Sequence, residues 1–403
     1  MSRLSMVERD ALPADERRFY DAVRALRRRP ITGPFVVTMN SSPDLAARYA
    51  HLGHYFHARG QADESIVPLR VRGYIALLGA RALDGPYEWA AWVNWAIEAG
   101  VPRETADAIR ERRTPASLTA EEELVTDVCT QLITGNHRAR RETFDAALAH
   151  FGVQGLVEVV VTLGYFAMIA LPLNAFEMEM SAEQKGSRKP FEPLKVTGLP
   201  GTHAQFARRD LPAFSLKRGG APRVPTLATH EDVPPRDQHF LDRVVRTRGW
   251  VSPVFQVLLH AADMAERVAN VGEFFLYKSS IPPATRTLTW LIAARELDCD
   301  YTWDAALAPA REAGVDDAVI SALERGKPLP PIPKEQQALF DFCHQLLRGN
   351  HHVTDDAYQA AIDAFGIPAA VQIAGTLGYF VMMGLVANAF EIPVSGDSAK
   401  PAL

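Results

Sequence analysis

Gly349-Asn350-His351 and, further on, Thr376-Leu377-Gly378-Tyr379-Phe380 decide the fold of this chain of 403 residues, because both stretches occur twice. The same residues stand 214 positions earlier, as Gly135-Asn136-His137 and Thr162-Leu163-Gly164-Tyr165-Phe166. At the same offset, Asn388-Ala389-Phe390-Glu391 repeats an earlier Asn-Ala-Phe-Glu. Agreement at one fixed offset indicates an internal duplication, which has to be recognised before a fold is assigned.

The duplication divides the chain into three parts. We predict a first repeat over residues 1–180, a linker over 181–236 and a second repeat over 237–403. The linker is rich in Pro, Gly, Lys and Arg, and it contains turn signals such as Gly219-Gly220 and Pro234-Pro235. Structureless segments of this length are usually functional or disordered. We therefore expect the linker to wrap one repeat or to cover a pocket.

Apolar residues recur with helical spacing in both repeats, and almost no alternation with the period of a strand is present, so we predict an all-α fold. The pattern in the first repeat predicts a series of helices. They cover residues 15–29, 43–57, 68–83, 87–99, 119–134, 141–151 and an apolar stretch that ends near 176. Gly100 is the predicted end of the fourth helix.

Residues 156–176 and their copy at 371–390 are apolar enough to resemble membrane spans. A helix that is apolar on all sides is either a membrane span or the centre of a core. Each copy contains a polar residue, Glu158 or Gln372, and the chain as a whole is only moderately hydrophobic. We therefore expect two core helices and no membrane partner.

Composition and charge restrict the class of protein. Hydrophobic residues make up 47% of the chain and charged residues 23%, which is typical of a soluble globular protein. The net charge of −5 does not favour nucleic-acid binding. The three cysteines form no Cys-x-x-Cys pair, and no apolar leader follows the first residues, so we expect a cytoplasmic protein. No nucleotide cofactor is indicated.

The repeated motifs resemble the carboxymuconolactone decarboxylase and alkyl hydroperoxidase D superfamily, here as a fused tandem. The resemblance is carried by a Tyr-x-Trp helix followed by Ala-Gly-Val at 99–101 and 313–315, by the Gly-Asn-His turn and by the Leu-Gly-Tyr-Phe helix. It covers both repeats and excludes the linker. It implies two helical repeats that pack as an intramolecular pseudo-dimer. Members perform several chemistries, so function has to be argued from the site.

The usual sites of that superfamily are incomplete in this chain. The Cys-x-x-Cys pair of the peroxidases would fall on Gly85 and Glu88 in the first repeat, and on Cys299 and Thr302 in the second. A lone cysteine cannot run a dithiol cycle, so peroxidase activity is not expected. The decarboxylase-like pattern keeps Glu88 but has Trp92 in place of the histidine. Glu88 is therefore a candidate general base.

Some proteins that this tandem resembles are iron-dependent dioxygenases that open polycyclic aromatic rings, with histidine ligands and a carboxylated lysine. The resemblance implies His54, His137 and His351 as iron ligands, with His57 as a further candidate and Lys278 as the lysine. His137 and His351 hold equivalent places in the two repeats, and equivalent residues can converge at a pseudo-twofold axis. Imidazole and carboxylate-type ligands suit Fe(II).

Structural roles remain open for each of these residues. Asn-His after Gly is a good helix-start turn, so His137 and His351 could bond only to the backbone. Lys278 could be a solvated surface residue. Tyr165 and Tyr379, which we keep as candidate catalytic residues, could equally belong to the core.

The leading expectation is an enzyme that acts on an aromatic or polyketide-like small molecule. Its most concrete form is a non-haem-iron dioxygenase, an oxidoreductase that cleaves a C–C bond. One alternative is a metal-independent decarboxylase, hydrolase or cyclase with Glu88 or a histidine as general base. A second alternative is a non-catalytic binding or scaffold protein. The sequence leaves open whether the chain forms a homo-oligomer.

Overall fold

Every regular element in the described part of the chain is a helix, which confirms the predicted all-α class. The computed structural model describes residues 2–27, 30–57, 64–134, 136–180 and 220–394. Most of the predicted linker, residues 181–219, lies outside the described residues, as does Gly135 of the repeated motif. What is said below of the fold concerns the described residues.

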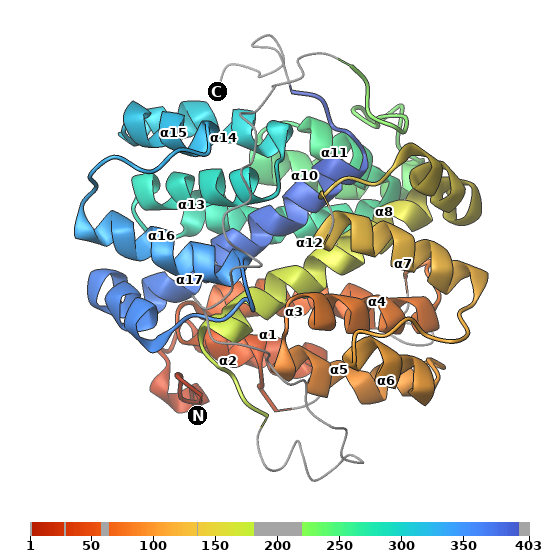
Figure 1. The fold of residues 1–403 in the computed structure, drawn as a ribbon, viewed down its shortest axis with the longest axis horizontal. Helices are drawn as coiled ribbons and strands as arrows, with labels where there is room; N and C mark the ends of the chain where they lie inside the picture. The colour runs from red at the N-terminus through yellow and green to blue at the C-terminus, as the bar shows by residue number, and fades with distance from the viewer. Residues whose placement is uncertain (1, 28–29, 58–63, 135, 181–219, 395–403) are drawn as a thin grey trace.

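The helices occur in the same order in both halves of the chain (Figure 1). In the first half they are η1 (Arg9–Ala11), α1 (Arg17–Arg27), α2 (Pro34–Met39), α3 (Pro43–His57), α4 (Leu69–Ala82), α5 (Pro86–Glu98), α6 (Arg103–Arg110), α7 (Ala120–Ile133) and α8 (Arg141–Ala175). In the second half they are η4 (Pro235–Asp237), α10 (Gln238–Arg248), α11 (Pro253–Leu258), η5 (Leu259–Ala261), α12 (Ala262–Glu273), the π-helical turn η6 (Phe274–Lys278), α13 (Pro283–Glu296), α14 (Asp300–Glu312), α15 (Asp317–Glu324), α16 (Lys334–Leu347) and α17 (Asp355–Ala389). From α4 onward, each helix of the first half has a counterpart that begins and ends 214 residues later.

Local sequence explains several helix ends. Thr119 and Glu122 form a reciprocal capping box that begins α7. Thr354 begins α17 by accepting a hydrogen bond from the backbone N–H of Ala357 at 3.3 Å. Gly100 follows α5 with φ of 107°, which confirms the predicted stop. The sequence patterns did not predict α2 and α6, which have 6 and 8 residues and are too short for a clear period.

The two longest helices, α8 and α17, run side by side through the middle of the molecule, with the other helices of each half packed around them (Figure 1). Among the described residues these two helices are long and apolar enough to cross a membrane, but 100% and 94% of their most apolar windows are buried by protein. They are core helices. Their polar residues hold loops: Glu158 accepts from the N–H of Ile66 at 3.0 Å, and Gln372 from that of Ser280 at 2.8 Å.

Both core helices bend at a glycine. Gly152 has φ 67° and ψ 178°, and Gly366 has φ 74° and ψ 163°, so the helical path is interrupted within α8 and α17. Positive φ is readily adopted by glycine. The predicted break after Phe151 is therefore present, as a kink inside one helix.

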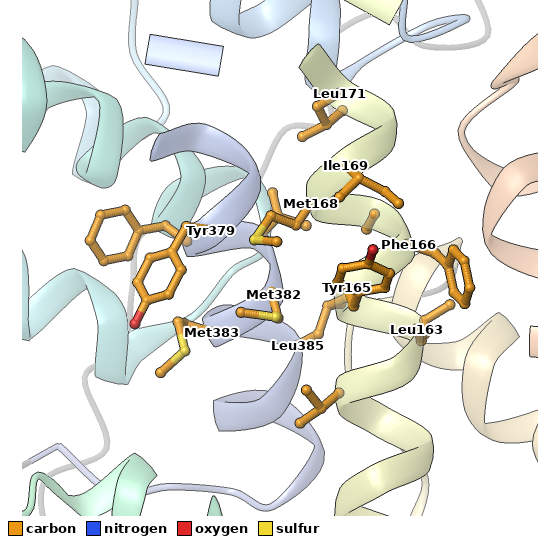
Figure 2. Close-up of a cluster of buried hydrophobic side chains, with 14 of the residues drawn as sticks. Leu163, Tyr165, Phe166, Met168, Ile169, Leu171, Tyr379, Met382, Met383 and Leu385 are labelled. Atoms are coloured by element: carbon orange, nitrogen blue, oxygen red, sulfur yellow. The ribbon is translucent and has the colours of Figure 1, made fainter. Parts of the chain in front are cut away.

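Small residues allow α8 and α17 to approach closely. A Cβ at Gly164 would lie 2.6 Å from Met382 Cγ, and a Cβ at Gly378 would lie 2.5 Å from the carbonyl oxygen of Met168. Gly378 and Met382 are 214 residues after Gly164 and Met168, so the contact is reciprocal. Figure 2 shows the two methionines between the helices.

A second reciprocal contact joins α3 to α12. Arg48 of α3 donates to the carboxylate of Glu273 at 2.7 Å, and it also reaches Asn270. Arg267 of α12 donates to the carbonyl oxygen of His51 at 2.9 Å. Both arginines are nearly buried, and hydrogen bonds from charged groups are stronger than neutral ones. These bonds hold α3 and α12 against each other.

Candidate functional site

Glu88 lies in the first turn of α5 and is only 1% exposed. One turn later, Trp92 donates its indole N–H to the Glu88 carboxyl group. The imidazole of His57, at the end of α3, stacks on the Trp92 ring with 4.0 Å between centroids and 19° between planes. His57 and Trp92 are half-buried, so they connect the buried carboxyl group to the protein surface.

Tyr165 of α8 completes this cluster. Its hydroxyl lies 3.3 Å from His57 Nε2, and its ring stacks on Phe56 at 4.6 Å. A Cβ at Gly53 would lie 2.5 Å from the Tyr165 hydroxyl oxygen. The missing side chain at Gly53 therefore makes room for the hydroxyl, and Tyr165 is both a core residue and a polar member of the site.

The cluster changes the acidity of its members. Burial raises the pKa of Glu88 to about 8, because the hydrogen bond from Trp92 and the positive charge of Arg27 offset only part of the desolvation. Burial also raises the pKa of Tyr165, with a further contribution from the negative charge of Glu88. Glu88 is thus largely protonated at neutral pH and can exchange its proton close to neutrality, as a general acid or base requires.

The second repeat does not contain this cluster. At the positions of His57, Glu88 and Trp92 it has Leu276, Thr302 and Ala306. The predicted catalytic residue Tyr379 accepts a hydrogen bond from Arg248 at 2.7 Å. Its neighbour Phe380 stacks on Trp290 at 4.2 Å. Tyr379 is therefore placed like Tyr165 but meets an arginine in place of a histidine.

His137 and His351 take the same position in the two repeats and bond to the backbone there. The Nδ1 atom of His137 lies 2.8 Å from the carbonyl oxygen of Leu132, and that of His351 lies 2.9 Å from Leu346. Both residues have positive φ, 62° and 59°. They complete the ends of α7 and α16 and do not begin the following helices, which start four residues later at Arg141 and Asp355.

Lys278 and His54 are further candidates for the iron site. Lys278 ends η6, and its side chain is 47% exposed and lies 3.3 Å from a carboxylate oxygen of Glu273. Carboxylation would replace this cation by an anion next to Glu273, which is unfavourable. His54 lies on α3 with a pKa lowered by burial and by the positive charge of Arg267.

The candidate iron ligands have different neighbours among the described residues. In them, no three His, Cys, Asp or Glu side chains form a group that could hold a metal ion. His57 faces Trp92 and Tyr165, and Lys278 faces Glu273. The iron centre stays a prediction.

The sequence patterns single out Glu88, His57 and Tyr165 separately and do not predict that they lie together. Trp92 stands in these patterns only where a histidine is expected. A tryptophan one turn after a buried acid could have suggested their hydrogen bond, because i and i+4 side chains share a helix face. The contact between Trp92 and His57 depends on how α3 packs in the tertiary fold, and no local sequence pattern indicates it.

Comparisons with protein-family models, curated proteins and solved structures found no match for this chain.

Proposed function

We propose that this protein is an enzyme that transfers a proton to or from an aromatic or polyketide-like small molecule, with Glu88 as general acid and base. The observation that carries the proposal is the buried carboxyl group of Glu88, whose pKa is about 8 and which lies behind the half-buried Trp92 and His57 rings. A carboxyl group with a pKa near the working pH is well suited to exchanging protons with a substrate. The metal-independent alternative is therefore favoured over the dioxygenase.

The side chains around Glu88 suit an apolar substrate. The Trp92 indole and the His57 imidazole are half-buried aromatic rings stacked on each other, and they give the entrance to Glu88 an aromatic, largely apolar lining. As a carboxylate, Glu88 would accept a proton from a substrate carbon next to a carbonyl group, and as an acid it would return it. The Tyr165 hydroxyl and His57 would donate hydrogen bonds to a substrate oxygen that gains negative charge.

Exchange of substrate protons with solvent tests this proposal without knowledge of the natural substrate. The protein is incubated in D₂O with 1-tetralone or 2-tetralone, and proton NMR follows the loss of the protons next to the carbonyl group. We expect Glu88→Gln to reduce the enzymatic acceleration by about 100- to 10,000-fold. Thr302→Val, at the equivalent position of the second repeat, is the matched control and should leave the acceleration unchanged.

Two outcomes would count against the proposal. Equal acceleration by the Glu88→Gln variant and the unchanged protein would remove Glu88 from the chemistry. Stable binding of the ketones with no acceleration at all would favour the binding or scaffold alternative. Circular dichroism of both variants shows whether the fold is intact.

We also propose that the architecture is an intramolecular pseudo-dimer of two carboxymuconolactone-decarboxylase-like repeats. The proposal is supported by the reciprocal pairs Gly164 with Met382 and Gly378 with Met168, and by matching bonds of Arg48 and Arg267. Such reciprocity is typical of isologous interfaces. A cytoplasmic location is part of the same proposal, since the three cysteines are unpaired and buried.

A further inference from the structure

Arg27 ends α1 and takes no part in the proton transfer proposed above. Its guanidinium carbon lies 4.1 Å from the centroid of the Phe35 ring, which is buried. Nη2 of Arg27 donates to Thr32 Oγ1 at 3.4 Å. Arg27 itself is half-buried. The buried ring therefore holds the guanidinium group in place by a cation–π contact, and part of the side chain stays accessible to solvent.

The segment that follows Arg27 packs against the start of α5, where Glu88 lies. A Cβ at Gly33 would lie 2.5 Å from Tyr87 Cε1, so the backbone before α2 touches the ring of the residue that precedes Glu88. Burial raises the pKa of Glu88 and of Tyr165, and the positive charge of Arg27 lowers both again. Arg27 is therefore close enough to the Glu88 cluster for its charge to act there.

The second repeat contains the same arrangement. Arg248 ends α10 as Arg27 ends α1, and its guanidinium carbon also lies 4.1 Å from the centroid of a phenylalanine ring, that of Phe255. Arg248 donates to the hydroxyl oxygen of Tyr379 at 2.7 Å, and Tyr379 is the counterpart of Tyr165. An arginine that stacks on a phenylalanine beside the tyrosine of the long core helix is thus a feature of both halves.

The chemistry around the arginine differs between the halves. In the second repeat the arginine is bonded to the tyrosine, whereas the Tyr165 hydroxyl lies 3.3 Å from His57 Nε2. Glu88 stands where the second repeat has Thr302, and with a pKa of about 8 it is largely protonated at neutral pH. The positive charge of Arg27 then lies near a neutral acid. A ligand group with negative charge is therefore favoured beside Arg27.

We propose that the substrate of the Glu88 site is an aromatic ketone that carries a carboxylate group, and that Arg27 binds this carboxylate. The proposal rests on the proposed function, because it names the substrate class of the same site. Arginine suits this role, since its planar guanidinium group can donate two parallel hydrogen bonds to a carboxylate. The ring of the substrate would then meet the aromatic lining formed by Trp92 and His57.

Two ketones of similar shape test the proposal by binding alone. They are 1-tetralone-4-carboxylate and the uncharged 4-methyl-1-tetralone, and isothermal titration calorimetry of the full chain at neutral pH measures the Kd of each. The carboxylate should bind about 10-fold more tightly, the size expected for a hydrogen bond between charged groups. Arg27→Gln should raise the Kd of the carboxylate by about 10-fold and that of the methyl ketone by less than about 2-fold.

Two further variants serve as controls for this measurement. Arg27→Lys keeps the charge but loses the planar pair of donors, so the Kd of the carboxylate should rise by only about 2- to 5-fold. Arg248→Gln removes the same charge and the same ring contact from the second repeat, and it should leave the Kd of both ketones unchanged.

Proton exchange in D₂O gives a readout that a purely structural role of Arg27 would not change. Loss of the Arg27 charge should raise the pKa of Glu88 further. The pH at which exchange of 4-methyl-1-tetralone reaches half of its maximal rate should therefore move to higher pH in Arg27→Gln. It should stay in place in Arg27→Lys and in Arg248→Gln.

Failure of this proposal can be told apart from failure of the proposed function. Tight, Arg27-dependent binding of the carboxylate without exchange of either ketone would support the Arg27 site and remove the proton transfer. Exchange that depends on Glu88, together with equal Kd values for the two ketones, would keep the proton transfer and overturn the Arg27 site. No binding of the carboxylate, or equal effects of Arg27→Gln and Arg248→Gln, would also overturn it. If Arg27→Gln does not fold, the two ketones with the unchanged protein and with Arg27→Lys decide the question.

Discussion

The start of α5 and the start of α14 have the same backbone and different chemistry. Glu88 on α5 is a buried acid bonded to Trp92, whereas α14 has Thr302 and Ala306 at these positions. The supporting contacts nevertheless recur: Asn174 and Asn388 each donate to the carbonyl oxygen of the residue after the preceding helix, Leu83 or Leu297, at 2.9 Å. The difference indicates that the scaffold does not need the acid, and this supports the proposal that Glu88 is a functional residue.

The largest expected effect concerns the pH dependence of stability, and it follows from Glu88 alone. Its pKa is about 8 in the folded protein against 4.5 when exposed, so the folded state keeps a proton that the unfolded state releases. The contribution of Glu88 to stability is therefore fully present below pH 4.5 and decreases up to pH 8. The free energy of unfolding should fall by up to about 1.4 kcal/mol per pH unit between these limits.

Glu88→Gln removes this titration and isolates its contribution. Urea unfolding at pH 5, 6 and 7 should show a shallower loss of stability for the Glu88→Gln variant than for the unchanged protein. Thr302→Val should keep the steep slope, because α14 has no acid at this place. Parallel slopes for Glu88→Gln and the unchanged protein would mean that Glu88 is not protonated in the folded state.

The same comparison shows what could be predicted from sequence. The helical pattern can be predicted from the repeated sequence. The bounds of α13 to α17 follow from those of α4 to α8 by a single offset. Glu88 can be identified as a candidate because it stands in the decarboxylase-like motif of the first repeat. His57 is predicted as a metal ligand, but it stacks on Trp92, because the tertiary fold places the end of α3 beside this residue of α5. Tertiary packing of this kind leaves no period or spacing in the sequence.

The ion pair between Glu296 and Arg348 could not be predicted from the sequence either, for a related reason. Glu296 and Arg348 are far apart in sequence and lie on different helices, so their pairing appears only when α13 meets α16. A signal was nevertheless present in the duplication itself. At the positions of Glu296 and Arg348 the first repeat has Ala82 and Thr134. A position-by-position comparison of the two repeats could have directed attention to this pair.

A smaller loss of stability is expected for substitutions at the contact between α8 and α17. It tests how symmetric the contact between the two repeats is. Gly378→Ala would place a Cβ 2.5 Å from the backbone oxygen of Met168, which cannot move without shifting α8. We expect a loss of about 2–3 kcal/mol. Gly164→Ala would mainly meet the flexible side chain of Met382, at 2.6 Å, and should cost about 1–2 kcal/mol.

Thermal and urea unfolding of both glycine variants measure these losses. A larger loss for Gly164→Ala than for Gly378→Ala would contradict the described contact. Losses below about 0.5 kcal/mol for both, the size typical of surface substitutions, would show that the two helices are not tightly packed at these glycines.

The smallest effect is expected at Lys278, and it decides whether the second repeat contributes a metal ligand. Under the proposed function, the proton chemistry belongs to the first repeat, and Lys278 is a half-exposed partner of Glu273. Lys278→Ala should then change the free energy of unfolding by less than about 0.5 kcal/mol, because exposed ion pairs contribute little. Removal of divalent metals with a chelator should leave both the melting temperature and the ketone exchange rate unchanged. A bound metal stabilises the folded state by mass action. A clear fall in melting temperature on chelation, lost in the Lys278→Ala variant, would therefore restore the iron-dependent dioxygenase and place Lys278 in its centre.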